Sequence, residues 1–368
     1  MRMLYATSNK YPSFKYANTG QILAMSKGFA DYLGGDFYLG GKNINPEAGS
    51  PIQTINFHTP KSYILGYKFV KFVRKKNIRV VYCREARLLF FIIFYNKLFF
   101  RLNLKFVYEI HALESKGLAN KIVEKVLSSR AHNFIFITKN LRDIYIEKYK
   151  VKEKQTLISP DAVDLSVFDI GATKEEARRK LNLPTDQQLI IYTGKFKTMG
   201  MDKGISDILK SLVFLPEDII FLAVGGSKDD IAQYQKQAED LEIGNRVKLV
   251  GHVSQSELAI YQKAADILLM PFPFNQHYAY YMSPLKMFEY MAAKRPIIAS
   301  NLPSIKEVLN SKNSCLCQPD NPKDLSEKIS FILNNKTLGE SLSEQAYSDV
   351  KNYTWEKRAE GILGFIGR

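Results

Sequence analysis

Short apolar runs alternate with longer segments of helical periodicity along the chain. Short apolar runs bounded by turn residues indicate buried strands, whereas apolar positions three and four residues apart indicate helices. Predicted strands occupy residues 4–6, 80–83, 105–110, 133–138, 189–193, 218–224, 247–250, 266–270 and 297–299. Predicted helices include residues 22–33, 256–265, 325–333 and 355–366. This alternation is typical of α/β domains built on doubly wound sheets.

The chain is too long for one such sheet. Its 368 residues exceed the size at which a single hydrophobic core usually stops growing, and its 46% hydrophobic content can fill two cores. Near residues 168–173, Gly171 is followed by the charged segment KEEARRKLNLP, which ends at Pro184. We therefore expect one domain over residues 1–170 and a second over residues 171–352.

Residues 281–307 contain the clearest candidate ligand site. Ser283 is a favourable N-cap, Pro284 suits the first helical position, and Leu285 begins an apolar stripe at helical spacing. The unpaired amides of such a helix start can hold a phosphate. Glu289 follows inside the apolar run, where a carboxylate needs a polar partner such as a pair of ribose hydroxyls.

This stretch resembles the donor-binding region of retaining glycosyltransferases with the GT-B fold, in particular those of family 4. Glu289 matches the second Glu of that family's Glu-x7-Glu motif, which binds the nucleotide ribose. Tyr281 stands where the first Glu would be, and Lys294 replaces the Gly that commonly ends this helix. The resemblance implies two Rossmann-like domains facing each other across a cleft. It also implies that the C-terminal helix, residues 353–368, crosses back to the first domain.

The resemblance continues in family order across most of the chain. The family's Gly-Arg-Leu and Lys-Gly segments, whose cations bind the donor diphosphate, match residues 194–196 and 203–204. The family's His beside the donor sugar, at the end of a strand, matches His111. The resemblance thus assigns catalytic roles to His111, Lys195 and Lys203. It assigns donor binding to Gly20, Gly194, Val253, Tyr281, Met282, Ser283, Pro284, Leu285 and Glu289.

Structural explanations compete with several of these roles. A lone His is more often structural, loop lysines are by default solvated, and a plain turn explains Gly20 equally well. Placement after buried strands favours the functional interpretation for His111 and both lysines, because the carboxyl ends of parallel strands border the ligand crevice. Ser304 and Glu307 form a capping-box pattern, so helix capping alone explains Glu307.

The charge of the chain indicates an acidic partner. The formal net charge of +15 and the pI near 9.4 suit nucleic acid, an anionic membrane or a phosphate-rich substrate. Residues 61–105 are densely basic and aromatic, and within them residues 88–100 (LLFFIIFYNKLFF) are almost wholly apolar. They indicate either a core helix surrounded by solvated lysines or a helix that touches an anionic bilayer. A lipid-linked acceptor would fit the second alternative.

The cysteines and the lengths of the apolar runs indicate the cellular compartment of the protein. Cys83, Cys315 and Cys317 form no even disulfide framework, which favours a reducing compartment. The amino terminus indicates a strand rather than a signal peptide, and no run reaches the roughly 20 apolar residues of a spanning helix. We expect a cytoplasmic protein that can bind peripherally to the inner membrane face.

The resemblance implies a retaining enzyme of the hexosyltransferase type. Its donor would be a nucleoside diphosphate sugar of the UDP or GDP type, and its acceptor a hydroxyl of a glycan or lipid-linked molecule in bacterial surface polysaccharide or glycoconjugate synthesis. Lys195, Lys203 and the amides of residues 283–286 can stabilise the leaving diphosphate, so we expect no metal and no cofactor.

Two other function classes stay open at the level of the sequence. The first is a sugar-nucleotide epimerase or hydrolase on a similar scaffold, which would release or rearrange the sugar without an acceptor. The second is a nucleic-acid-binding protein, which rests only on the basic charge. Because no recognisable nucleic-acid motif is present, no nucleic-acid partner is expected.

Overall fold

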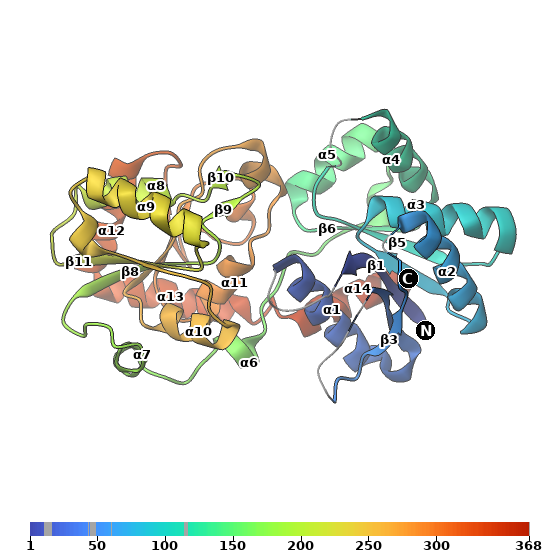
Figure 1. The fold of residues 1–368 in the computed structure, drawn as a ribbon, viewed down its shortest axis with the longest axis horizontal. Helices are drawn as coiled ribbons and strands as arrows, with labels where there is room; N and C mark the ends of the chain where they lie inside the picture. Colours follow the sequence, from blue (N-terminus) through green and yellow to red (C-terminus); the bar gives the residue numbers. More distant parts are fainter. Residues whose placement is uncertain (11–16, 43, 45–48, 60, 114–116, 368) are drawn as a thin grey trace. The chain divides into compact units, whose positions relative to one another are not determined.

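The computed structural model describes the chain except residues 11–16, 43, 45–48, 60, 114–116 and 368 (Figure 1). The chain divides into two compact units. The first combines Met1–Asp161 with Trp355–Arg368, and the second is Ala162–Thr354. Within the described residues, no helix has both the length and the apolar character needed to cross a bilayer.

The first unit is built on a seven-stranded parallel sheet in the order β3-β2-β1-β4-β5-β6-β7. Its central strands are buried on both faces, as parallel strands covered by helices must be. The strands are β1 (Met3–Lys10), β2 (Phe37–Lys42), β3 (Gln53–Asn56), β4 (Val80–Cys83), β5 (Lys105–Ile110), β6 (Asn133–Phe136) and β7 (Thr156–Ile158). The helices are α1 (Ala17–Leu33), α2 (Ser62–Lys75), α3 (Ala86–Tyr95), α4 (Leu118–Arg130), α5 (Lys139–Tyr149) and α14 (Trp355–Gly367), with short turns η1 (Gly34–Asp36), η2 (Asn96–Phe100) and η3 (Glu153–Gln155).

The second unit is built on a six-stranded parallel sheet in the order β12-β11-β8-β13-β14-β15. Its strands are β8 (Gln188–Thr193), β11 (Ile219–Val224), β12 (Val247–Val250), β13 (Ile267–Met270), β14 (Ile297–Ser300) and β15 (Cys315–Cys317), and β9 (Lys197–Thr198) and β10 (Met201–Asp202) form a separate hairpin. The helices are α6 (Leu165–Phe168), α7 (Lys174–Lys180), α8 (Ile205–Leu212), α9 (Lys228–Asp240), α10 (Gln255–Lys263), α11 (Leu285–Ala292), α12 (Pro322–Asn334) and α13 (Lys336–Val350), with short turns η4 (Gly244–Arg246), η5 (His277–Tyr281) and η6 (Ile305–Glu307).

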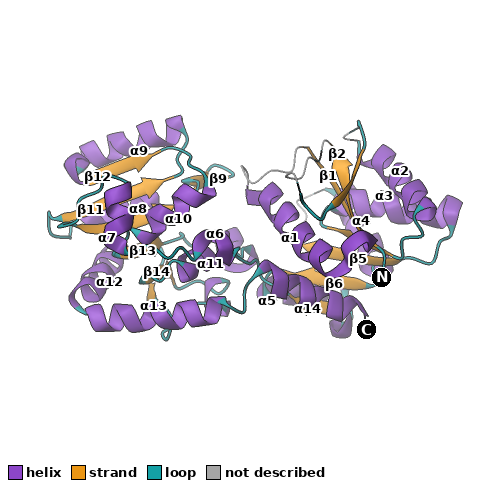
Figure 2. Cartoon of the chain, turned by 90° about the horizontal axis from the view of Figure 1, so that it is seen from below, coloured by secondary structure: helices purple, strands orange, loops and turns teal. Residues whose placement is uncertain are grey.

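Alternate residues of β8 build the two cores of the second unit. Leu189 and Ile191 pack on one side with residues of α10, α11 and α13. Ile190 and Tyr192 pack on the other side with residues of α8, α9 and α12. The sheet accordingly lies between α9 and α13 in Figure 2. The predicted pair of doubly wound parallel sheets is confirmed.

The last helix packs on the first unit, as the resemblance implies. Figure 1 shows the red α14 beside the blue α1. Trp355, Ala359 and Ile362 on α14 are buried. On α1, a Cβ at Gly28 would lie 2.9 Å from the carbonyl oxygen of Trp355, so glycine allows the two backbones to approach closely.

Candidate functional site

Two glycine turns meet at the carboxyl ends of the strands of the second unit. Gly194 follows β8 and Gly225 follows β11, and both have positive φ, +101° and +114°. The amide of Gly194 donates a hydrogen bond to the carbonyl oxygen of Val224 (2.8 Å). A Cβ built at Gly225 would lie 2.8 Å from the carbonyl oxygen of Gly194. Glycine therefore allows the two turns to pack backbone against backbone at the edge where α/β sheets bind nucleotides.

The β9–β10 hairpin brings the two predicted diphosphate lysines together. It occupies the insertion between Lys195 and Lys203, and the amide of Lys203 donates to the carbonyl oxygen of Phe196 (3.0 Å), which closes the hairpin at its base. Burial, and then the charge of Lys195, lower the pKa of Lys203 to about 8. The effect of the Lys195 charge on Lys203 shows that the two side chains lie close to each other.

Glu289 is buried on α11 and held by α10. It is only 9% exposed, and the side-chain amide of Gln262 donates to Glu289 Oε2 (3.1 Å) and to Thr193 Oγ1 (3.0 Å). Burial raises the pKa of Glu289 to about 7, although the Gln262 hydrogen bond opposes this shift. The predicted ribose-binding carboxylate is therefore oriented next to the end of β8. Gln262 was not found from the sequence, because nothing in its helical pattern distinguishes it from a surface glutamine.

The start of α11 differs from the sequence prediction by one residue. Pro284, not Ser283, is the N-cap, Leu285 is the first helical residue, and no side chain caps the helix. Pro284 lacks the side-chain oxygen that an N-cap usually supplies. Binding of a ligand by the amides of this first turn stays a prediction.

Lys286, in the first turn of α11, is a second residue that the sequence analysis missed. Its Nζ lies 3.4 Å from the centroid of the Tyr192 ring. Among the described residues this nitrogen has no hydrogen-bond partner, and Gln262 Oε1 has none either. Burial, and then the charge of Lys203, hold the pKa of Lys286 well below its ordinary value.

The other predicted donor-binding residues of the second unit lie on loops around this site. Tyr281 ends η5, and its hydroxyl accepts a hydrogen bond from the side-chain amide of Gln276 (2.8 Å). Met282 and Ser283, in the loop that enters α11, are buried. Val253 follows β12 and packs against the core. Their contacts with a donor stay predictions.

Two departures at the ends of elements have clear causes. Lys294 keeps the left-handed conformation of the glycine it replaces (φ +55°), with its Nζ 3.3 Å from Asp169 Oδ1 and 3.6 Å from the centroid of the Tyr347 ring. The predicted Ser304–Glu307 capping box is wrong, because Ser304 Oγ instead donates to the carbonyl oxygen of Tyr278 (2.6 Å).

His111 of the first unit lies over a buried carboxylate. Its Nε2 is 2.8 Å from Glu109 Oε1, and the guanidinium of Arg358 on α14 also donates to that oxygen (2.7 Å). Tyr82 donates its hydroxyl hydrogen to Glu109 Oε2. Burial alone would raise the pKa of Glu109, but Arg358 and then His111 hold it well below its ordinary value. Since an ionised carboxylate only accepts, Nε2 of His111 carries the donated hydrogen.

Gly20 has a different local structure from the one expected. The sequence placed it in the loop before a helix, whereas α1 begins at Ala17 and contains it. The helical pattern was recognised only from its strongly apolar part. A role of Gly20 at the donor phosphate stays a prediction.

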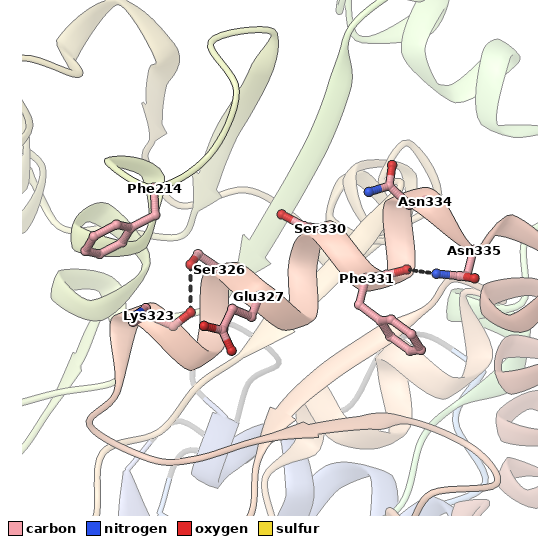
Figure 3. A pocket seen from close by; sticks show the side chains of 8 residues that line it. All are labelled: Phe214, Lys323, Ser326, Glu327, Ser330, Phe331, Asn334 and Asn335. Carbon is pink, nitrogen blue, oxygen red and sulfur yellow. Dashed lines mark hydrogen bonds between the residues drawn. The ribbon is translucent and has the colours of Figure 1, made fainter.

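A pocket on α12 lies apart from the predicted site residues. Figure 3 shows its lining by Phe214 and by α12 and the residue after it: Lys323, Ser326, Glu327, Ser330, Phe331, Asn334 and Asn335. None of the candidate donor-binding side chains lines it. Nor does the described part of the chain contain a cluster of three or more His, Cys, Asp or Glu residues suited to hold a metal ion.

Residues 173–349 match the family model described as glycosyl transferases group 1. The second unit belongs to this family. The group 1 match contains Gly194, Lys195, Lys203 and Glu289.

The curated relatives share only a small part of their sequence with this chain. An uncharacterized glycosyltransferase of Methanocaldococcus jannaschii is 22% identical over 67% of this chain and 69% of the relative. A D-inositol 3-phosphate glycosyltransferase of Mycobacteroides abscessus is 24% identical over 67% of this chain and 54% of the relative, so the chain spans about half of that protein. An alpha-monoglucosyldiacylglycerol synthase of Streptococcus pneumoniae is 26% identical over 47% of this chain and 38% of the relative.

Solved structures share the fold over the whole chain. HepE of Anabaena, in complex with UDP, has a TM-score of 0.80 at 15% identity. The match covers 100% of this chain and 100% of that chain. A glycosyltransferase of Rickettsia africae has a TM-score of 0.80 at 16% identity, with 99% of this chain and 97% of that chain covered. These likenesses show the GT-B fold, which confirms the predicted fold class.

Proposed function

We propose that this group 1 glycosyltransferase moves a sugar from a nucleoside diphosphate donor to an acceptor hydroxyl with retention of configuration. The observation that carries the proposal is that Lys195 and Lys203 lie at the hairpin after β8, while Gln262 links Glu289 to Thr193 at the end of the same strand. The lysines suit a diphosphate, and the buried carboxyl suits ribose hydroxyls. Complexes of the Anabaena relative with UDP and with UDP-glucose support a UDP donor, with GDP as the alternative.

The proposed reaction needs positive charge where the diphosphate leaves. The bond between the anomeric carbon and the diphosphate oxygen breaks while the acceptor oxygen attacks on the same face of the sugar. The acceptor proton passes to the leaving diphosphate, whose remaining charge Lys195 and Lys203 stabilise. We propose that these cations act without a metal or cofactor, and that His111 contacts the donor sugar from the first unit.

A nucleotide-binding panel tests the donor assignment. Thermal unfolding is followed for the wild type and Glu289→Ala with UDP, GDP, ADP and dTDP and with their sugar conjugates. A ligand that binds the folded state alone raises the apparent stability, so we expect one nucleotide series to stabilise the wild type and to fail with the variant. Equal stabilisation of both proteins would contradict the assignment of Glu289.

Product analysis separates transfer from the alternative reactions. With the donor identified, the protein is incubated with donor alone and with a set of glycan and lipid-linked acceptors. NMR coupling constants of the anomeric proton in donor and product report retention or inversion. Free or epimerised sugar in the absence of any acceptor would favour an epimerase or hydrolase and contradict the proposed transfer.

We further propose that the outer face of α2, α3 and η2 binds the anionic inner membrane surface, where a lipid-linked acceptor would be found. Exposed apolar side chains stand on this face: Tyr63, Tyr67, Phe94, Leu98 and Phe99 are 41–62% exposed. Ring contacts such as Tyr67 with Tyr95 (5.6 Å between centroids) join α2 to α3. The opposite face of α3 is buried, so the segment meets both the core and the solvent.

Basic side chains border the same face. Arg74 and Lys75 end α2, and Lys97 and Arg101 lie in or beside η2. Apolar rings with flanking cations match an anionic bilayer surface, where each cation contributes about 1 kcal/mol. The name of the Streptococcus pneumoniae relative, a diacylglycerol glycoside synthase, is compatible with a lipid acceptor.

Vesicle co-sedimentation tests the membrane proposal. At low salt we expect the wild type to sediment with anionic vesicles, and the triple variant Phe94→Ser, Leu98→Ser, Phe99→Ser to stay in solution. Phe214→Ser with Phe331→Ser, which removes comparably exposed rings from the second unit, is the matched control and should behave as the wild type (Figure 3). Equal sedimentation of both variants would overturn this assignment.

A further inference from the structure

Two buried polar atoms without partners lie in the candidate donor site. Among the described residues only three buried side-chain atoms have no hydrogen-bond partner, and two of them are Lys286 Nζ and Gln262 Oε1. The residue Lys286 is 8% exposed and Gln262 is fully buried. Since buried polar groups in folded proteins are nearly always paired, their occurrence together indicates that a ligand supplies partners at this site.

Lys286 lies against the glycine turn that precedes Lys195. Its Nζ would be 3.5 Å from a Cβ at Gly194, and it lies over the Tyr192 ring. The residue belongs to the uncapped first turn of α11, whose amides are suited to a phosphate. A phosphate bound between this turn and Lys195 would thus be near Nζ of Lys286.

The surroundings of Lys286 disfavour a charge when no anion is bound. The charged groups that act on Lys286 are Lys203, at the end of the hairpin, and Glu289, one turn further along α11, and its Nζ lies over the ring of Tyr192 of β8. Burial and the charge of Lys203 lower the pKa of Lys286, and Glu289 only partly opposes them. A nearby diphosphate would reverse this balance, because opposite charge favours the ammonium form.

Building on the proposed function, we propose that Lys286 is a third diphosphate-binding cation, which takes up a solvent proton when the donor binds and returns it when the nucleoside diphosphate leaves. The amine becomes an ammonium group that donates hydrogen bonds to phosphate oxygens. Glu289 acts in the opposite direction, since ribose hydroxyls favour its ionised form. The pKa of Glu289 is about 7, so its released proton partly cancels the uptake below that pH and not above it.

Calorimetric titration of UDP and GDP tests the proposal. Binding is measured at pH 6 and pH 8.5 in buffers of different ionisation enthalpy, which gives the number of protons taken up. For the nucleotide that binds, we expect Lys286→Met to take up fewer protons than the wild type at pH 8.5. We also expect it to bind about 10- to 100-fold more weakly, as for loss of a charged hydrogen bond. Lys236→Met, which removes an exposed lysine of α9, should match the wild type.

The stability of the wild type and of Lys286→Met without nucleotide distinguishes a ligand-binding role of Lys286 from a purely structural one. Met fills nearly the volume of an uncharged lysine and leaves no unpaired amine, so free Lys286→Met should be at least as stable as the wild type. Lower stability of the free variant with unchanged nucleotide affinity would show a purely structural contact with Tyr192 and overturn the proposal. Equal proton uptake and affinity in both proteins would also overturn it. If the wild type binds neither UDP nor GDP, the UDP or GDP donor of the proposed function is contradicted instead.

Discussion

At the scale of single residues, the burial of Glu289 destabilises the folded protein at neutral pH. The pKa of Glu289 in the folded state, about 7, lies above the ordinary value of 4.5. The folded state therefore binds a proton more tightly than the unfolded chain does, and it loses stability as the pH rises from about 4.5 to 7. The loss is fully present above pH 7 and amounts to at most about 3 kcal/mol.

Glu289→Gln should remove this penalty. We expect the variant to gain up to about 3 kcal/mol of stability over the wild type at pH 8 and much less at pH 5, because glutamine does not ionise. Urea unfolding at both pH values measures the difference. The same variant should bind the nucleotide more weakly, because a neutral amide is a poorer acceptor for ribose hydroxyls. A stability difference independent of pH would contradict the buried-carboxyl explanation.

The sequence can propose only those candidate site residues whose role depends on local pattern, and their roles stay predictions. Glu289, Lys195 and Lys203 could be predicted because they follow buried strands or interrupt an apolar run at family spacing. Gln262 and Lys286 could not, because each gains its importance from a contact between elements far apart in the chain. Gln262 reaches Thr193 and Glu289 from α10, and Lys286 reaches Tyr192 from α11.

At the scale of elements, the β9–β10 hairpin depends on Gly204 where it joins α8. Gly204 has φ +96°, and a Cβ there would overlap the carbonyl group of Pro271, which follows β13. Gly200, in the turn of the hairpin, also has a positive φ (+76°), but a Cβ there would meet nothing within 4 Å. Alanine at Gly200 would therefore introduce backbone strain alone, whereas alanine at Gly204 would introduce both backbone strain and steric overlap.

Gly204→Ala should destabilise the second unit more than Gly200→Ala does. We expect about 1–2 kcal/mol for Gly200→Ala from the left-handed backbone alone, and about 3 kcal/mol or more for Gly204→Ala, which adds the overlap. Chemical unfolding of the two variants measures both values. Gly204→Ala should also weaken nucleotide binding by displacing Lys203. Similar losses in the two variants would count against the overlap with Pro271.

Strand and helix existence was predictable, whereas the ends of elements were not. Apolar runs located the main strands of both sheets because a strand covered on both faces must be apolar throughout. The start of α11 shifted because Pro284 took the cap position without a capping side chain. The segment 88–100 divides into α3 and the wider turn η2, since Asn96 uses its side chain to bind the backbone of Leu102 at both the amide and the carbonyl (3.0 Å each).

At the scale of the whole molecule, both ends of the chain build the first unit. Arg358 of α14 donates to Glu109 of β5 (2.7 Å) and to the carbonyl oxygen of Pro160 (2.8 Å). Both ionised side chains are almost fully buried. Through Glu109, this pair also orients His111.

Arg358→Met should leave Glu109 as an unpaired buried charge. We expect a loss of about 3–5 kcal/mol at pH 7, measured by urea unfolding. Because the pKa of Glu109 is depressed, its contribution is present above about pH 4.5 and disappears as the pH falls through the folded-state pKa. The difference between the variant and the wild type should therefore shrink in acid. Arg2→Met, which removes an exposed partner of Asp36, should cost less than about 1 kcal/mol. A comparable loss in both variants would contradict the role of burial.

The placement of α14 has a consequence for synthesis on the ribosome. Residues 1–161 emerge first, yet Arg358 follows only after the whole second unit has been translated. At about 5–20 residues per second, this delay is on the order of 10–40 s. During it, the nascent first unit has Glu109 without its arginine and α1 without its covering helix. Termination between Thr354 and Arg358 would thus release a chain whose second unit is complete and whose first unit is exposed to proteases and chaperones.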